Sequence, residues 1–425
     1  MTALVFAYTI MVTAFDLFAA WVYAQGGADL EIVTAFRVVR DGLAAALGLW
    51  GLAHVRRNPM AGLAMAAYAL FIVVYAVFSE ARMDSALVNA SIVRLALPAV
   101  LVMIGMGGLN DEKALTRYAV LVAGLSCVSA VFGVWDIRHT EFWTDTLEYG
   151  YYLHDVKGIT TGFDSRWLLP FNFFGYEYQR RAAGLVAAPL AQGSLLAVGA
   201  VLGYAALGRK YLPVAGLVLA LCLLGVWQSG TRGAFLMVAL ALPIYMLGGN
   251  RENGAMVRNL AIMALIAGSA YETLAYVVSY SVSYADGSTI GHVDALARNL
   301  ENLDEVLLMG KGIGMAGTDT SSAGQEIAGG GEGALFSVIY QLGLPGGIAF
   351  LAFYIVCAMA ALKRARGMSG GHDIALATFA LTVGLATSMI ISEHLFSLSA
   401  TAPFWIVLGG VLGLPLKKPE AKAAP

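Results

Sequence analysis

Charged residues are scarce in this chain. Only 13% of its 425 residues are Asp, Glu, Lys or Arg, whereas 59% are hydrophobic and the mean hydropathy is +0.73. Soluble globular domains carry about twice that share of charge, so this composition excludes an ordinary soluble domain and makes lipid the expected solvent.

Cysteine and metal-binding patterns are equally sparse. The three cysteines, Cys127, Cys222 and Cys357, all fall inside apolar stretches, where they behave as small hydrophobic residues and imply no disulfide framework. No Asp-x-Asp motif occurs anywhere in the chain. We therefore predict no metal ion and no other cofactor.

Long apolar segments dominate the rest of the sequence. A bilayer core needs about 20 apolar residues per helix, and unpaired backbone groups are too costly in hydrocarbon for other structures, so helices are expected. We predict one all-α integral membrane domain, residues 1–425, with about 12 transmembrane helices. The predicted spans are 2–24, 30–55, 60–80, 88–108, 117–135, 184–207, 212–228, 234–248, 259–281, 334–360, 374–393 and 397–415.

The distribution of Lys and Arg indicates an orientation. If the N-terminus is cytoplasmic, fourteen of the 26 basic residues lie on the cytoplasmic side in mostly short loops, as the positive-inside rule favours. Residues 136–183 and 282–333 then become two long outer loops of roughly fifty residues each, a length usually linked to function or disorder. The aromatic content of the first loop argues against disorder and favours a folded cap, although an interfacial aromatic belt explains most of these rings equally well.

Several ionisable residues fall inside the predicted spans, where each costs roughly 3 kcal/mol to insert and is a functional candidate. At a rise of 1.5 Å per residue, their depths below the outer end are about 9 Å for Arg94, about 10 Å for Arg37, about 12 Å for Asp16 and about 13 Å for Glu272. Arg40 and Asp41 lie slightly deeper. The shared depth predicts a polar cavity that opens outward; the alternative is that these charges simply pair and tie helices together.

Two arginine motifs lie where outer loops meet helices. Arg180 and Arg181 precede the span that starts at 184, and adjacent guanidinium groups at a helix start suit an anion. Arg232 lies in the very short turn Gln228-Ser229-Gly230-Thr231-Arg232-Gly233, which leaves it little room to reach bulk water. Each arginine has a plainer interpretation as a solvated or headgroup-anchoring side chain.

A third stretch runs from Arg298 through the glycine-rich residues 310–317 to Glu332. Gly312-x-Gly314-x-x-Gly317 formally matches a dinucleotide fingerprint, but that motif requires a strand before it and a helix after it. The glycines are better explained by tight turns or close backbone approach. Glu332, flanked by glycines before a spanning helix, is the best-placed general base, although an acid favoured by the helix dipole would look the same.

Together these stretches resemble the O-antigen polymerase and O-antigen ligase superfamily of bacterial membrane glycosyltransferases, which are GT-C-like. The resemblance covers about residues 180–360. It rests on Arg181 with Gly184 and Pro189, on Thr231-Arg232-Gly233, and on Arg298, the Gly310–Gly314 run, Glu332 and Gln341-Leu342-Gly343-Leu344-Pro345-Gly346-Gly347.

The resemblance implies a polysaccharide polymerase in the bacterial inner membrane, with its active site facing the periplasm. Its substrate would be a polyprenyl-diphosphate-linked oligosaccharide, and a chain-length regulator or export protein is a further candidate partner; no nucleic acid is expected. Arg181 and Arg232 would hold the diphosphate and Glu332 would deprotonate the acceptor hydroxyl. Binding would be assisted by Arg180, Arg298, Arg94, Arg37 and Arg40.

One departure from the family pattern helps to choose between its members. Ligases of this superfamily tend to carry a His where this chain has Glu332, and His292, the nearest one in the loop, lies forty residues upstream. This favours a polymerase over a ligase that transfers glycan to lipid A core. A transporter or flippase for a lipid-linked glycan is the rival from another class; it would predict inverted repeats and broken helices.

Overall fold

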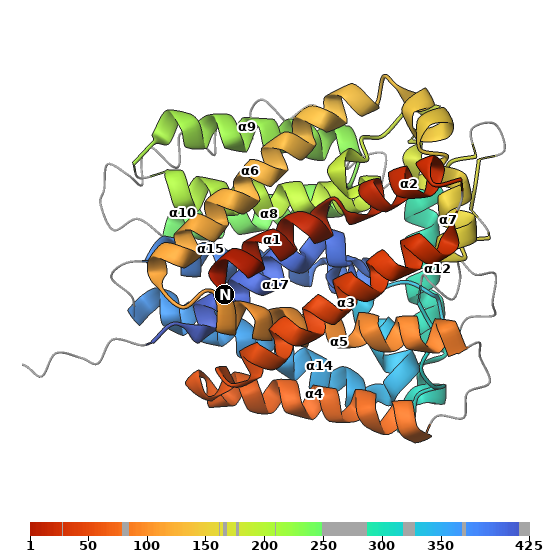
Figure 1. Ribbon diagram of the computed structural model, residues 1–425. Helices are drawn as coiled ribbons and strands as arrows, with labels where there is room; N and C mark the ends of the chain where they lie inside the picture. Colours follow the sequence, from red (N-terminus) through yellow and green to blue (C-terminus); the bar gives the residue numbers. More distant parts are fainter. Residues whose placement is uncertain are drawn as a thin grey trace, which may run out of the picture.

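The computed structural model describes residues 1–27, 29–78, 85–160, 162–164, 168–175, 178–208, 210–248, 287–317, 328–367 and 371–415. Helices that run side by side make up the bundle, and the described ranges contain two isolated bridges but no β-strand (Figure 1). The all-α prediction is confirmed for this part of the chain.

Helices occupy eleven of the twelve positions predicted for spans. They are α1 (Thr2–Thr13) with α2 (Phe15–Gln25), α3 (Leu30–Leu52), α4 (Pro59–Phe78), α5 (Ser85–Gly108), α6 (Glu112–Asp136), α8 (Pro189–Leu207), α9 (Leu212–Ser229), α10 (Arg232–Gly248), α14 (Ala334–Gly367), α15 (His372–Ala386) with α16 (Ser388–Ile391), and α17 (Leu398–Gly413). The predicted span 259–281, with Glu272, lies outside the described residues.

Seven helical segments in the described ranges are long and apolar enough to cross a bilayer, or eight if α1 and α2 count as one bent span. They lie in α4, α5, α6, α8, α9, α14 and α15–α16, and they indicate an integral membrane protein. Helices α10 and α17 are apolar but shorter, and α3 carries four charged side chains. The count of about 12 spans therefore remains a prediction.

Two of the predicted continuous spans are broken. The axes of α1 and α2 meet at 61°. Before the bend, the hydroxyls of Thr9 and Thr13 donate to Val5 O and Thr9 O, a local bonding pattern that tends to bend helices. Helix α14 is interrupted at Gly343, whose φ of 75° is not helical, two residues before Pro345.

Helices α8 and α17 lie in the middle of the bundle, and nearly all of their residues are buried. Glycines allow the close approach that this requires. A Cβ on Gly105 of α5 would lie 2.0 Å from Ile406 O, and one on Gly409 of α17 would lie 2.0 Å from Val102 O. Small residues at such contacts are typical of helix packing in membranes.

The helix bundle has two ends, called here the cap end and the tail end. The cap end, on the right in Figure 1, is where α6 ends and α8, α10 and α14 begin; α7 (Tyr149–Lys157) and α12 (Gly287–Glu301) also lie there. The tail end, opposite, is where α3, α5 and α17 end. At the cap end the segment between α6 and α8 packs an aromatic cluster against α2, with Trp143, Tyr152 and Phe173 fully buried.

Replacing Gly105 by Ala should destabilise the fold by about 1–3 kcal/mol, because a methyl group has no space between α5 and α17. Thermal unfolding of the purified chain in detergent measures the effect. Gly124→Ala on α6 is the matched control, since nothing lies within 4 Å of a Cβ there. Equal melting temperatures for the two variants would contradict the close α5–α17 contact.

Candidate functional site

The segment that carries Arg181 is held by a buried carboxylate. Asp136, the last residue of α6, accepts the backbone N–H groups of Ala183 at 3.1 Å and Gly184 at 2.7 Å. Gly184 has φ +57°, and a Cβ there would lie 2.2 Å from the Gln192 side-chain amide. Only glycine suits this position, which explains the Gly184 of the sequence motif.

Arg181 is fixed through both its backbone and its side chain. Its N–H donates to Phe173 O at 2.9 Å, and its Nε donates to Ser229 O at 2.7 Å. Burial, and secondly the positive charge of Arg232, lower the pKa of Arg181 to about 10. The side chain still carries its charge at neutral pH, and it lies close enough to Arg232 for the two cations to repel each other.

Arg232 is the first residue of α10 and follows a tightly packed turn. The Thr231 hydroxyl donates to Pro189 O at 3.1 Å and accepts from the Ser229 hydroxyl at 3.0 Å. Gly230 adopts φ +61°, and a Cβ there would lie 2.9 Å from Arg181 Nε. The Thr-Arg-Gly turn and the Arg181 segment therefore form one packed unit at the cap end.

Glu332 lies beside His292, although forty residues separate them in the chain. A carboxylate oxygen of Glu332 and Nδ1 of His292 share a short hydrogen bond, and the two side chains remain 39% and 41% exposed. Asn299, buried on α12, supports this loop: its side chain accepts the Gly330 N–H at 2.7 Å and donates to Glu332 O at 3.0 Å. The pair is thus both oriented and accessible.

A third group of charges comes from α5 and the segment after α16. Arg94 forms an ion pair with Glu393 at 2.9 Å, and the Glu393 side chain is only 4% exposed. The next residue, His394, is surrounded by cations. Burial first, and then the charges of Arg181, Arg94 and His292, lower its pKa to about 4. His394 therefore links the three groups into one neighbourhood.

Glu393 and His394 were not among the residues predicted from sequence. Both lie at the edge of a stretch that hydropathy assigns to a span, so composition alone hides them. The available signal was a carboxylate and an imidazole side by side at a predicted outer boundary.

Four arginines predicted to bind substrate have other surroundings. Arg180 donates to Phe173 O at 3.0 Å and stacks over the Phe173 ring. Arg298 is exposed and bonds Asp294 O of its own helix. Arg37 donates to Val156 O at 2.8 Å, and Arg40 pairs with its neighbour Asp41 at 2.7 Å.

The charges on α2 and α3 thus form a second cluster, separate in its bonds from the first. Asp16 pairs with Lys157 of α7 at 2.7 Å and accepts from the Tyr152 hydroxyl at 3.2 Å. These contacts, with those of Arg37, connect α7 to α2 and α3. For Asp16, the ion pair matches the alternative in which such charges hold segments together, whereas Asp41 pairs with its neighbour Arg40 on the same helix.

The glycine-rich run 310–317 fills the break in α14. In a regular helix, the carbonyls of Tyr340 and Gln341 would accept from the N–H groups four residues later. Gln341 O loses its donor because Pro345 has no N–H, and Tyr340 O loses its donor because Gly343 is not helical. Instead, Lys311 N–H donates to Tyr340 O at 2.8 Å and Gly312 N–H donates to Gln341 O at 3.3 Å. The resemblance to a dinucleotide fingerprint is therefore formal, and tight backbone approach accounts for the glycines.

The resulting site contains three cations, Arg94, Arg181 and Arg232, and two carboxylates, Glu332 and Glu393. A narrow crevice lies beside Glu332 and is lined by Asn299, Gly317, Ser337 and Tyr340 among others. In the described ranges no three His, Cys, Asp or Glu side chains lie close enough to hold a metal ion. The surplus of positive charge suits an anionic ligand beside a proton acceptor.

No protein-family model matches this sequence, and no relative is found among curated proteins.

The environment of His394 predicts its titration. Because its pKa lies near 4 while that of an unfolded histidine is about 6.5, the unfolded chain binds more protons between these values. Stability contributed by neutral His394 is full above pH 6.5 and is lost as the pH falls toward 4. Histidine NMR signals of the full chain should show one imidazole that stays neutral at pH 5.5.

Arg94→Gln should raise the pKa of His394, because it removes a nearby cation and leaves Glu393 without its ion-pair partner. Arg298→Gln, which changes an exposed arginine on α12, is the control and should leave that pKa unchanged. A His394 signal that titrates near 6.5 in the unmodified chain would refute the proposed arrangement of charges.

Proposed function

We propose that this protein is a membrane polysaccharide polymerase that joins polyprenyl-diphosphate-linked oligosaccharide repeat units. The observation that carries the proposal is the meeting of Arg181 and Arg232 with Arg94 and the Glu332–His292 pair at one end of the bundle. These residues come from five segments of the chain, and the outermost of them are Arg94 and Glu332. The sequence resemblance supplies the substrate class, and the arrangement is consistent with it.

The proposed step is a direct displacement. A hydroxyl oxygen of the acceptor sugar attacks the anomeric carbon of the donor, and the bond from that carbon to the diphosphate oxygen breaks. The hydroxyl proton passes to the Glu332 carboxylate, and polyprenyl diphosphate leaves with the electron pair. A single displacement inverts the anomeric configuration.

The arginines stabilise the leaving group. Charge develops on the diphosphate as the glycosidic bond breaks, and guanidinium groups fixed in an apolar environment stabilise it without reorganisation. Arg181 is fixed through Ser229 O and Phe173 O, and Arg232 by its place in the α10 turn. The His292 imidazole orients the Glu332 carboxylate through their hydrogen bond, and it can share the proton that Glu332 takes from the acceptor hydroxyl.

The distribution of basic residues supports the proposal that this site lies on the periplasmic face of the inner membrane. At the tail end, the helix ends and the turns between helices carry several basic residues: Arg56, Arg57, Lys113, Lys210, Lys363, Arg364 and Arg366. Positively charged loops favour the cytoplasm, so the cap end faces outward. Lipid-linked repeat units would then reach the site from the outer leaflet.

A ligase is the second candidate, and His292 is the observation that favours it. Forty residues separate His292 from Glu332 in the chain, a spacing that favours a polymerase, yet the two side chains are in contact. A histidine is thus available at the site, as it is in the ligases that the chain resembles. The transporter alternative is less well supported. It expects a broken helix at the binding site, whereas residues 310–314 fill the break in α14 with their own hydrogen bonds.

Glu332→Gln should lower the rate of repeat-unit joining by about 100-fold or more, because an amide is not a base. In cells that depend on this chain for polymer synthesis, single lipid-linked repeat units should accumulate. Glu301→Gln, an exposed change on α12, is the control. Accumulation of long lipid-linked polymer would indicate the ligase instead, and normal polymer with reduced export would contradict both.

Arg181→Gln should reduce turnover by about 100-fold through loss of leaving-group stabilisation, while Arg181→Lys, which keeps the charge, should retain more activity. Purified full chain in liposomes with a lipid-linked repeat unit measures both. Arg298→Gln should have little effect, since its side chain is exposed and bonds its own helix. Equal losses for Arg181→Gln and Arg298→Gln would be inconsistent with the proposed site.

A further inference from the structure

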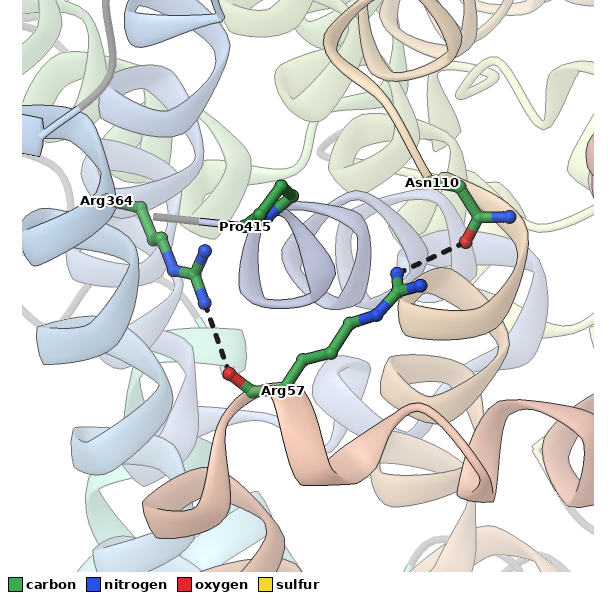
Figure 2. A pocket seen from close by; sticks show the side chains of 4 residues that line it. All are labelled: Arg57, Asn110, Arg364 and Pro415. Carbon is green, nitrogen blue, oxygen red and sulfur yellow. Dashed lines mark hydrogen bonds between the residues drawn. The ribbon is translucent and has the colours of Figure 1, made fainter. Parts of the chain in front are cut away.

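A second basic site lies at the tail end, at the opposite end of the bundle from Glu332. It is a cavity of about 410 Å³ lined by Arg57, Asn110, Arg364 and Pro415 (Figure 2). Arg57 belongs to the short 3₁₀ turn η1 (Val55–Arg57) between α3 and α4, and Arg364 lies near the end of α14. The two guanidinium groups thus come from segments more than 300 residues apart.

Arg364 is a buried cation, and one of its N–H donor groups lacks an acceptor. Its residue exposure is 4%, and its Nη2 donates to Leu412 O at 3.1 Å and to Arg57 O at 3.4 Å. Its Nη1 is buried and has no hydrogen-bond partner. A buried charged donor without an acceptor is costly, so an acceptor at this place would be stabilising.

Arg57 faces the same cavity from the other side (Figure 2). Its Nη1 donates to Gly413 O at 3.3 Å and to Asn110 Oδ1 at 3.5 Å, both neutral acceptors. Among the ion pairs of the described residues, none involves Arg57 or Arg364. Among the described residues, the negative potential that both arginines contact is the carbonyl end of α17, which carries a partial charge.

The surroundings of the cavity are those of a membrane surface. In the helices that flank η1, the apolar side chains of Leu49, Trp50, Leu52, Met60 and Leu63 are all more than half exposed. Such side chains match the acyl and interfacial region of a bilayer, and a basic pocket between helix ends matches an anionic headgroup. The cavity is also of the size that holds a small organic ligand rather than a lone ion.

We propose that this cavity binds the phosphate group of an anionic phospholipid headgroup, with Arg57 and Arg364 as its ligands. Two guanidinium groups on either side of the cavity can each offer paired N–H donors to phosphate oxygens, which is the geometry that arginine favours. The phosphate would supply the acceptor that Arg364 Nη1 lacks and a counter-charge that neither side chain has among the described residues. Binding would join the ends of α14 and α17 to the turn before α4, independently of the reaction at the cap end.

The test measures thermal stabilisation of the purified full chain in a neutral detergent by three added probes. Short-chain phosphatidylglycerol should raise the melting temperature in a saturable manner. Short-chain phosphatidylcholine, whose choline cation the arginines repel, should not. Inorganic phosphate distinguishes a free-phosphate site: stabilisation as strong as that by phosphatidylglycerol at equal concentration would overturn the lipid assignment.

Variants separate the cavity from general surface charge. Arg57→Gln, at an exposed position, should fold normally and bind phosphatidylglycerol about tenfold more weakly, the loss expected for one charged hydrogen-bonding partner. Arg56→Gln, its exposed neighbour, should bind unchanged. Arg364→Gln and Arg366→Gln form a second pair with a buried and an exposed member. Equal losses within a pair, or no loss in Arg57→Gln, would overturn the proposal.

Discussion

The structure depends on one constraint: in apolar surroundings, each backbone group or charge that leaves a regular helix needs a partner from elsewhere in the chain. Asp136 meets this need for the Arg181 segment by accepting two backbone N–H groups. The run 310–314 meets it for α14, where Gly343 and Pro345 leave two carbonyls without helical donors. The polar elements at the cap end are therefore tied to the helices that surround them.

The same constraint creates the chemical character of the site. Arg94 is balanced by Glu393, but Arg181 and Arg232 lie close enough to repel each other. Burial, and then the charges of Arg181, Arg94 and His292, lower the pKa of His394. Like charges held together by a rigid scaffold represent an unfavourable energy that a bound anion would relieve. The Glu332–His292 pair, in contrast, is partly exposed, so a substrate hydroxyl can reach it.

Much of the bundle could be predicted from composition, because apolar segments of span length leave few alternatives to helices. The bends could not: the break of 61° between α1 and α2 depends on local threonine bonding, and hydropathy averages over it. Of the site, Arg181, Arg232 and Glu332 could be proposed because each is a charge next to glycines at a predicted boundary. Their partners could not, since the contacts of Glu332 with His292 and of Arg94 with Glu393 join segments 40 and 299 residues apart. Depth alone grouped Arg37 and Arg40 with Arg94, although Arg37 bonds Val156 of α7 and Arg40 pairs with its neighbour Asp41.

The central claim is that Arg181 and Arg232 form an anion site beside the Glu332–His292 pair. A cryo-electron microscopy map of the full chain with a polyprenyl diphosphate analogue tests it most directly. The account predicts diphosphate density in contact with both guanidinium groups and a few ångströms from the Glu332 carboxylate. Diphosphate density at another place, or a bound analogue that neither arginine contacts, would contradict it.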